Sequence, residues 1–335
     1  MKAAYYEHQG TALDVLKIGD VPTPVPGPGE VRVRVVISGV NPSDIKGRNG
    51  FKGPMPFKRI IPHQDGAGVI ESVGEGVSEA SIGERVWMFE AQNGRPFGTA
   101  AQFVVLPASN VVPLADHVSF ETGASLGIPA LTAHYCLFAD GELSGKRVLV
   151  QGGAGVVGEA AIQLAKWAGA WVATTIRHAD DCATVKASGA DLVINMREEN
   201  VDATINAATH GRGVDRIVEV DPIANLDIDT ACLAKGGTIS IYAVTTPDAV
   251  LSVPVMKSMG NCSVLRFVLV YNIPNEAKRR AIRDVTSCLA RGAYRPTMGL
   301  TVPLEQIAQA HDALDARGVK GKVLVSIDSS PPARD

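Results

Sequence analysis

The chain has 335 residues, of which 46% are hydrophobic and 20% are charged, and its formal net charge is −3 at pH 7. Such a composition supports a large core, and the length favours two domains over one. Basic and acidic residues are interspersed along the chain. We therefore expect no nucleic-acid partner and no polybasic membrane anchor, because neither kind of basic stretch is present.

The five cysteines are scattered along the chain and never form a C-x-x-C pair. This pattern favours reduced thiols over a disulfide framework or a cysteine-rich zinc lobe. The N-terminal residues lack the apolar segment of a signal peptide, and no apolar run reaches the ~20 residues of a membrane-spanning helix. We therefore expect a cytoplasmic protein that does not enter the membrane.

Short strand-like segments fill the first third of the chain. In residues 31–40, VRVRVVISGV, apolar and polar side chains alternate at the start, and β-branched side chains are frequent. Similar segments occupy residues 66–74, 84–89 and 100–107, with Gly and Pro close by. Short strands with frequent turns are typical of a small barrel-like all-β fold.

From about residue 120, strands alternate with helices. A helix is predicted over residues 159–169, where apolar residues recur on one stripe. This rhythm indicates βαβ units and a parallel sheet. The predicted strands cover residues 147–152, 171–176, 191–195, 215–220 and 237–244. The C-terminal part adds an amphipathic helix at 276–292, a strand at 321–327 and a terminus, SSPPARD, that we expect to fray.

The strongest functional signal is the hexapeptide Gly153-Ala154-Gly155-Val156-Val157-Gly158. It follows a predicted buried strand and opens a predicted helix, which is the context of a dinucleotide-binding G-x-G-x-x-G motif. We assign the tight turn to Gly153, the approach of backbone amides to a pyrophosphate to Gly155, and close helix packing to Gly158. The alternative is a glycine-rich turn that binds no ligand.

The end of the second predicted strand bears on which dinucleotide is bound. An NAD site usually carries an acidic residue there for the ribose 2′-OH. Here the strand continues into Arg177 and His178, and the next carboxylate is Asp180. Because a guanidinium can hold a 2′-phosphate, we favour NADPH, with Thr175 and His178 as weaker candidates for the same site. The alternative is that Arg177 is an ordinary surface charge.

At these residues the chain resembles the zinc-free quinone oxidoreductases of the ζ-crystallin type, within the medium-chain dehydrogenase/reductase superfamily. The resemblance implies an α/β protein in which a GroES-like β-rich catalytic domain (residues 1–122 plus 266–335) is split around a Rossmann domain with a doubly wound parallel sheet (residues 123–265). It also implies an interdomain active site and a homodimer. The matching segments are SGVNPSDIKGR (38–48), GAGVIESVGEGV (66–77), GIPALTAH (127–134), VLVQGGAGVVGEAAIQLAK (148–166), GADLVIN (189–195) and GKVLV (321–325).

The main alternative assignment within the superfamily is to the zinc alcohol dehydrogenases. Their three zinc-ligand positions fall on Asn41, Gln64 and Ile128 of this chain. Two amides and an alkyl group replace two thiolates and an imidazole, so no suitable ligand set for zinc remains. We therefore expect no metal at the site. Stoichiometric zinc in the purified protein would instead favour a zinc alcohol dehydrogenase.

The resemblance also assigns roles to single residues. Asn41, Gln64 and Arg266 would lie near the reacting groups, while Thr132 would contact the nicotinamide ribose and Lys322 the cofactor. Each has a plainer alternative: that Asn41 shapes only the turn before a proline, that Thr132 bonds within its helix, and that Lys322 is a solvated charge. The remaining expected cofactor contacts are Tyr242, Ala243 and Phe267.

One departure from the family concerns the proton donor. Lys46 stands where relatives often carry a tyrosine, so either Lys46 or bulk water would protonate the reduced acceptor. Without a metal to stabilise an alkoxide, reduction of an electron-poor acceptor is favoured over alcohol oxidation.

Three functions follow from the sequence. The first is reduction of quinones by NADPH, and the second is NADPH-dependent reduction of the alkene in enones or enals. The third is a cofactor-binding protein with a structural or RNA-binding role and little turnover. The absence of a basic stripe disfavours the RNA-binding form of the third.

Overall fold

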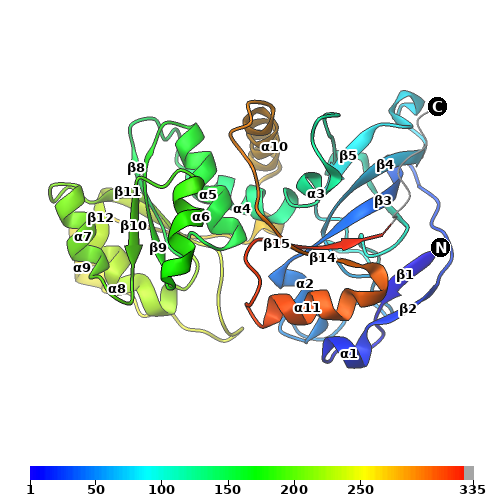
Figure 1. The fold of residues 1–335 in the computed structure, drawn as a ribbon, viewed down its shortest axis with the longest axis horizontal. Coiled ribbons are helices and arrows are strands. Elements are labelled where there is room, and N and C mark those ends of the chain that lie inside the picture. Colours follow the sequence, from blue (N-terminus) through cyan, green and yellow to red (C-terminus); the bar gives the residue numbers. More distant parts are fainter. Residues whose placement is uncertain (328–335) are drawn as a thin grey trace. The chain divides into compact units, whose positions relative to one another are not determined.

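The computed structural model describes residues 1–327. The terminus SSPPARD, which was expected to fray, lies outside them. The chain forms two compact units, one built from Met1–Ile128 with the segment from Pro296 onwards, and one from Pro129–Arg295 (Figure 1). Within the described residues, no helix has both the length and the apolar character needed to cross a bilayer.

The first unit is rich in strands, as the sequence predicts. Its seven-stranded sheet has the order β14-β15-β3-β4-β5-β7, with β6 paired to β3, and every pair except β14–β15 is antiparallel. Its elements are β1 (Lys2–Tyr5), α1 (Ala12–Val15), β2 (Lys17–Asp20), β3 (Glu30–Val40), α2 (Pro42–Arg48), β4 (Asp65–Val73), β5 (Arg85–Met88), β6 (Phe103–Pro107), β7 (Val111–Pro113), α3 (Phe120–Gly123), β14 (Met298–Pro303), α11 (Ile307–Asp315) and β15 (Lys322–Ser326).

Strand β3 explains how this sheet is covered. Along Val31, Val33 and Val35 every second side chain is buried, which is the period-two pattern of a strand with one face in the core. From Ile37 to Val40 every residue is buried. That end of β3 leads into the buried polar group that is described below.

The second unit contains a wholly parallel sheet flanked by helices. Its elements are α4 (Gly127–Phe138), β8 (Arg147–Val150), α5 (Val156–Trp167), β9 (Trp171–Ile176), α6 (Cys182–Ala187), β10 (Leu192–Asn195), α7 (Val201–Ala208), β11 (Val214–Glu219), α8 (Pro222–Cys232), β12 (Leu233–Ile241), α9 (Val255–Asn261), β13 (Val264–Phe267) and α10 (Asn275–Ala290). The first two residues of α4, Gly127 and Ile128, are part of the first unit, and the rest of the helix is part of the second.

The strand order of this sheet is β10-β9-β8-β11-β12-β13. The chain therefore runs outward from β8 in one direction and from β11 in the other, which is the doubly wound order of a Rossmann fold. Figure 1 shows α5 and α6 on one face of the sheet and α7 and α8 on the other. Ligands of such sheets bind at the carboxyl ends of the strands where the order reverses, here between β8 and β11.

The segment 266–295 belongs to the second unit, whereas the sequence analysis assigned it to the β-rich domain. Strand β13 pairs with β12 and so extends the parallel sheet. Helix α10 packs on α5, and the Gln163 side chain bonds both the N–H and the carbonyl of Arg295, at 2.7 and 3.1 Å. These contacts hold the segment against the Rossmann sheet.

Candidate functional site

The glycine-rich turn connects β8 to α5 in the second unit. Gly152, the residue before the motif, has the left-handed backbone conformation in this turn, with φ +71°. Gly153 keeps a hydrogen bond from its N–H to the Thr175 carbonyl at 3.1 Å. A Cβ at Gly153 would lie 2.0 Å from Thr174 Oγ1, so the small residue is needed for close packing and not for the turn itself.

The other two glycines of the motif differ in their surroundings. A Cβ at Gly158 would lie 2.4 Å from the Gly152 carbonyl oxygen, which agrees with the predicted close approach of the helix. Gly155 is exposed, and the nearest atom to its added Cβ would be the same oxygen at 3.5 Å. A side chain at position 155 would therefore extend away from the fold, on the side where the turn faces outward.

The backbone amides of this turn form a potential anion site. The N–H of Gly155 bonds the Gly152 carbonyl at 3.1 Å. Within the described part of the chain, no hydrogen bond is made by the N–H groups of Ala154, Val156, Val157 and Gly158. These groups stand at the N-terminus of a 12-residue helix, where the helix dipole adds positive potential. This arrangement suits a phosphate group.

The residues at the end of β9 separate into a buried and an exposed group. The Thr175 hydroxyl is buried, donates to Gln151 Oε1 at 2.7 Å and accepts the Gly152 N–H at 3.0 Å. It therefore supports the turn from below. Arg177 and His178 are exposed. An Arg177 Nη2 atom lies 3.5 Å from Asp221 Oδ2, so a carboxylate does reach this position, but it follows β11 and not β9.

Three buried polar residues that the sequence analysis did not name lie beneath the turn. Gln151 follows β8, Glu219 ends β11 and Asp229 lies on α8. Gln151 Nε2 donates to Asp229 Oδ1 at 2.7 Å. The one sequence signal for this group was a carboxylate, Glu219, that directly follows the apolar pair Ile217 and Val218 at the end of the strand.

The remaining predicted residues of the second unit have varied environments. Thr132 is buried on α4. Tyr242 and Ala243 follow β12, and the Tyr242 N–H donates to the Glu219 carbonyl at 3.1 Å, which brings this loop beside the end of β11. Burial raises the pKa of the Tyr242 hydroxyl. Phe267, at the end of β13, is 68% exposed.

Arg266 was predicted to lie near the reacting groups, and the structure gives it local partners. Its Nη2 atom lies 2.5 Å from Asp140 Oδ1, and its guanidinium lies 5.9 Å from the centre of the Tyr135 ring. Arg216 also bonds the Asp140 carbonyl, at 3.0 Å. Arg266 is therefore fixed at the C-terminal end of α4.

The first unit contains a buried polar group around Asp65. Asp65 Oδ2 accepts from Asn41 Nδ2 at 2.8 Å and from Lys322 Nζ at 3.1 Å, and its Oδ1 accepts the Ile128 N–H at 2.9 Å. Lys322 Nζ also donates to Asn41 Oδ1 at 2.7 Å. Lys322 is 2% exposed, so it is not the solvated charge considered as its alternative.

Asn41 combines two structural roles. It precedes α2 as the N-cap residue, its N–H donates to Asp44 at 2.8 Å, and Pro42 follows at the first helical position. Its amide oxygen and nitrogen both bond within the Asp65 group. Asn41 therefore shapes the turn before the proline, as its alternative proposed, and it also ties that turn to Lys322. The sequence analysis missed Asp65 as the centre of this group.

Gln64 and Lys46 occupy separate positions in the same unit. Gln64 is buried, donates to Gln92 Oε1 at 3.1 Å and accepts the Gln92 N–H at 3.2 Å. Lys46 Nζ lies 4.5 Å from the centre of the Phe51 ring. Partial burial, followed by the charges of nearby basic residues, lowers the pKa of Lys46. A lysine with a lowered pKa gives up its proton more readily.

The positions at which zinc dehydrogenases carry ligands hold Asn41, Gln64 and Ile128, and both amides are occupied by protein partners. Over residues 1–327, no three His, Cys, Asp or Glu side chains form a group that could hold a metal ion. His63, next to Gln64, bonds Ser38 Oγ at 2.8 Å and His311 Nε2 at 2.9 Å, and burial lowers its pKa well below the usual value.

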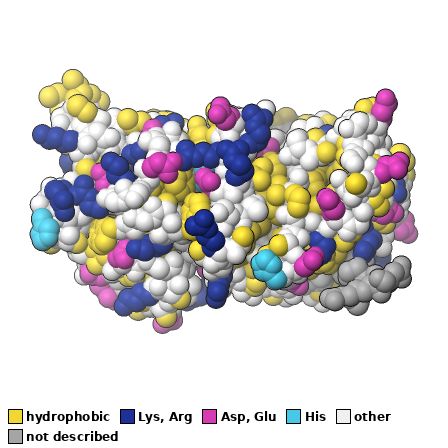
Figure 2. Space-filling model, turned by 90° about the horizontal axis from the view of Figure 1, so that it is seen from above, with side chains coloured by type: hydrophobic (Ala, Val, Ile, Leu, Met, Phe, Trp, Pro, Cys, Tyr) yellow, Lys and Arg dark blue, Asp and Glu magenta, His cyan; other side chains and the backbone are white. Residues whose placement is uncertain are grey.

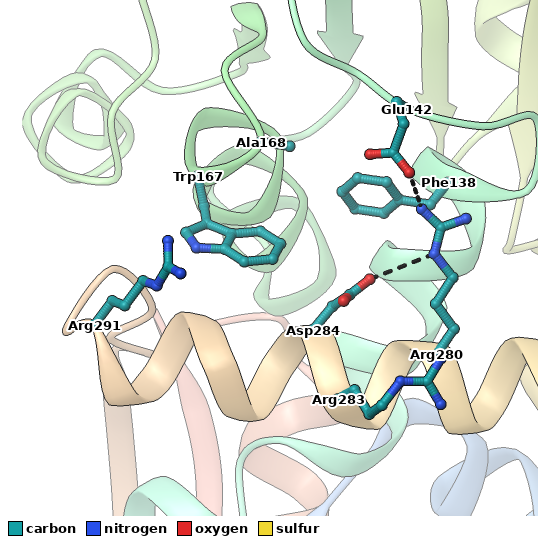
Figure 3. Close-up of a pocket in the computed structure, with 8 residues that line it drawn as sticks. All are labelled: Phe138, Glu142, Trp167, Ala168, Arg280, Arg283, Asp284 and Arg291. Carbon is teal, nitrogen blue, oxygen red and sulfur yellow. Dashed lines mark hydrogen bonds and ion pairs between the residues drawn. The ribbon is translucent and has the colours of Figure 1, made fainter.

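A cavity of about 390 Å³ lies elsewhere in the second unit, between α10 and residues at the C-terminal ends of α4 and α5 (Figure 3). Arg280 bridges it by pairing with Glu142 at 2.6 Å and with Asp284 at 3.6 Å, and Asp284 also bonds His134 Nε2 at 2.7 Å. Basic side chains gather over this helix in Figure 2. None of the predicted site residues lines the cavity, whose walls are Phe138, Glu142, Trp167, Ala168, Arg280, Arg283, Asp284 and Arg291.

Comparison with known families agrees with both units. A family profile described as "Alcohol dehydrogenase GroES-like domain" matches residues 27–116, and one described as "Zinc-binding dehydrogenase" matches residues 156–287. The quinone oxidoreductase of Sus scrofa is 31% identical over 315 residues, which cover 93% of this chain and 94% of the relative. The chain belongs to the quinone oxidoreductase family of the medium-chain dehydrogenase/reductase superfamily.

Solved structures of other proteins have the same fold as this chain. An NAD-dependent alcohol dehydrogenase matches it with a TM-score of 0.86 at 27% identity, covering 98% of this chain and 100% of the other. A mycobacterial protein complexed with NADPH matches with a TM-score of 0.84 at 27% identity and the same coverage. The predicted α/β fold with a GroES-like unit and a Rossmann unit is confirmed, and the chain is an oxidoreductase of the superfamily.

Proposed function

We propose that this family member is an NADPH-dependent quinone reductase that transfers hydride without a metal ion. The observation that carries the proposal is the set of backbone N–H groups around Gly155, which have no partner within the described residues. They would bond the diphosphate of the dinucleotide at the N-terminus of α5. The relatives named quinone oxidoreductase and the mycobacterial neighbour with NADPH support the acceptor and the cofactor.

The choice of NADPH rests on Arg177. The guanidinium lies at the end of β9, the strand end that reads the ribose in Rossmann domains. Its ion pair with Asp221 at 3.5 Å is partly exposed and therefore weak enough to exchange for a 2′-phosphate. Bidentate hydrogen bonds to a phosphate are shorter and stronger than such a pair.

The metal-free route rests on the donor set. Two carboxamides and an alkyl chain are poor ligands for zinc, and the amides of Asn41 and Gln64 already bond Asp65, Lys322 and Gln92. When bound, the reduced nicotinamide would supply the hydride. The chain would then orient an acceptor that accepts hydride without Lewis-acid help, as a quinone does. Thr132, Tyr242 and Ala243 are the proposed contacts of the nicotinamide half.

Lys46 is the proposed proton donor to the reduced acceptor. Its lowered pKa allows the ammonium to release a proton and to recover it from solvent between turnovers. Arg266 and Lys322 have a weaker claim to direct roles, because Asp140 and Asp65 hold their charged groups.

Cofactor preference tests the proposal directly. In fluorescence titrations, wild type should bind NADPH more tightly than NADH, and Arg177→Ala should weaken NADPH binding about tenfold or more while leaving NADH binding unchanged. Arg279→Ala, an exposed arginine on α10, is the matched control and should change neither affinity. An unchanged preference in Arg177→Ala would mean that this residue does not read the phosphate.

Turnover with 1,4-benzoquinone and with a simple enone, each followed by loss of NADPH absorbance, tests the acceptor. Reduction of the quinone supports the proposal. Reduction of the enone alone would instead identify an alkene reductase, and tight NADPH binding with neither activity would favour a non-catalytic role. Stoichiometric zinc in elemental analysis would overturn the metal-free route.

We also propose a homodimer formed through the outer edge of the second unit. Among residues 1–327, strand β13 pairs only with β12, so its other edge is an open sheet edge within that part of the chain. Apolar side chains of the adjoining α9 are exposed, with Met256 at 79% and Met259 at 66%. Apolar exposure beside an open sheet edge suits a second copy of the same surface.

Light scattering after size-exclusion chromatography should give twice the mass of one chain. A double variant, Met256→Glu with Met259→Glu, should shift the protein to monomer, because charge at the contact opposes association. Leu13→Glu, at a residue of the first unit with 78% exposure, should leave the dimer intact. A wild-type protein that stays monomeric at all concentrations contradicts this proposal.

We propose a cytoplasmic location because of the oxidation state of the cysteines. All five are free thiols in the structure, as expected for a protein in a reducing compartment.

A further inference from the structure

Two buried carboxyl groups lie side by side under the glycine turn. Glu219 at the end of β11 and Asp229 on α8 are both 0% exposed, and each carboxyl group lies close enough to the other to interact with it. Two carboxylate anions repel and offer no donor, so a hydrogen bond between the two groups requires that one of them keeps its proton.

The partners of the two groups identify the protonated one. Both oxygens of Glu219 accept from Asn225 Nδ2, at 3.1 and 3.3 Å, and one also accepts the Asp221 N–H. Asp229 Oδ1 accepts from Gln151, whereas Asp229 Oδ2 meets no donor among the described residues. Glu219 is therefore the anion, and Asp229 donates its proton from Oδ2.

Electrostatics agree with this assignment. Burial and the adjacent Glu219 charge raise the pKa of Asp229 well above the usual carboxyl range. Burial also raises the pKa of Glu219, but the hydrogen bonds from Asp229, Asp221 and Asn225 oppose that rise. The shared proton thus resides on Asp229.

One side of the pair leads to the glycine turn. Gln151 donates to Asp229 with its Nε2 and accepts the Thr175 hydroxyl with its Oε1, at 2.7 Å in each case. The Thr175 oxygen in turn accepts the Gly152 N–H at 3.0 Å. Gly152 is the left-handed residue with which the turn begins.

The other side of the pair leads to the ribose end of the site. The Glu219 carboxylate accepts the Asp221 N–H, and the Asp221 side chain pairs with Arg177. The hydrogen bonds therefore join the ends of β9, β8 and β11, across the point where the strand order reverses.

We propose that Asp229, held as the neutral acid, is a positioning residue that fixes both the glycine turn and the Asp221 partner of Arg177 for dinucleotide binding. This role rests on the proposed function, because it presumes that the turn binds NADPH. Asp229 does not touch the proposed cofactor site. It acts through Gln151 and Glu219, so its loss should weaken cofactor binding and leave hydride transfer at saturating NADPH largely intact.

Two substitutions of Asp229 separate the effect of its hydrogen bonds from the effect of its side-chain volume. Asparagine offers an oxygen to Gln151 and an N–H to Glu219, so Asp229→Asn should keep NADPH affinity and kcat near wild type. Asp229→Leu fills the space but removes both bonds, and it should raise the Kd for NADPH about tenfold or more, as expected for a lost buried hydrogen bond. Thr230→Val is the matched control, because Thr230 is buried on the same helix and its hydroxyl donates to the Leu226 carbonyl, away from the carboxyl pair.

Gln151→Met provides a second variant should Asp229→Leu fail to fold, because it cuts the link to the turn and leaves the carboxyl pair in place. It should show the same loss of NADPH affinity at unchanged saturated kcat. Wild-type affinity in both variants, or equal losses in Asp229→Asn and Asp229→Leu, would overturn the positioning role. A wild type that binds no NADPH would overturn the proposed function and this role together.

The pH dependence of stability tests the shared proton without any cofactor. Because the pKa of Asp229 is higher in the folded than in the unfolded chain, the folded state binds more protons, and stability falls as pH rises from the usual carboxyl range through the raised pKa. The other titratable groups facing the pair are Asp221, Cys232 and Tyr242. Asp229→Asn should flatten the fall in urea midpoint, and a slope equal to that of wild type would contradict the protonated state.

Discussion

Replacement of Lys322 by methionine should lower the free energy of unfolding by about 3–5 kcal/mol, the range found when one partner of a buried ion pair is removed. Lys322 and Asp65 are 2% and 0% exposed, and the ammonium also bonds Asn41. The substitution would leave the Asp65 carboxylate buried, with the Asn41 amide and the Ile128 N–H as its remaining donors among the described residues. Urea denaturation followed by circular dichroism measures the change.

A second substitution identifies the cause of that loss. Asp65→Asn added to Lys322→Met removes the uncompensated charge and should recover a large part of the stability. Lys2→Met serves as the control, because Lys2 pairs with Glu305 on the surface, and its replacement should leave the unfolding curve unchanged. No recovery in the double variant would mean that lost packing, and not the buried charge, sets the cost.

The same pair of variants tests a direct role for Lys322. Should the double variant regain stability and bind NADPH as wild type does, the ammonium is not a cofactor contact and its function is to hold Asn41 and Asp65. Regained stability with lost NADPH affinity would support the contact that the family resemblance implies.

Local patterns predicted the regular elements of this fold well. The strand expected at 171–176 has those bounds, the one expected at 31–40 begins one residue earlier, and the one expected at 66–74 begins and ends one residue earlier. The bounds of α4, the helix of Thr132, were not predicted, because nearly all of its residues are buried and its apolar run therefore lacks the period of an amphipathic helix. It also missed β13, a short edge strand with exposed ends.

The candidate site shows where local reasoning stops. The motif located the glycine turn, but it gave no sign that Gly152, the residue before the motif, adopts the left-handed conformation. The partners of Arg177 and Lys322, Asp221 and Asp65, lie far from them in the sequence. Sequence periodicity reports which face of an element is buried, and it carries no information on which distant side chain meets that face.

The glycines of the motif should separate folding from cofactor binding. Gly155 has φ −78° and ψ 157°, values that alanine adopts freely, and its added Cβ would meet no atom closer than 3.5 Å. Gly155→Ala should therefore change the free energy of unfolding by no more than about 0.5 kcal/mol. Its methyl group would stand among the amides proposed to bind the diphosphate, so the Kd for NADPH should rise about 10- to 100-fold.

Gly153→Ala is the matched substitution with the opposite expectation. Its Cβ would lie 2.0 Å from Thr174 Oγ1 and 2.8 Å from Ile162 Cδ1, both in the core between β9 and α5. Overpacking of this kind costs about 1–3 kcal/mol of stability. Thermal unfolding and NADPH titration of both variants provide the comparison. A stable Gly155→Ala protein that binds NADPH as tightly as wild type would show that the diphosphate does not lie on this turn, because the added methyl group would disturb a diphosphate bound there.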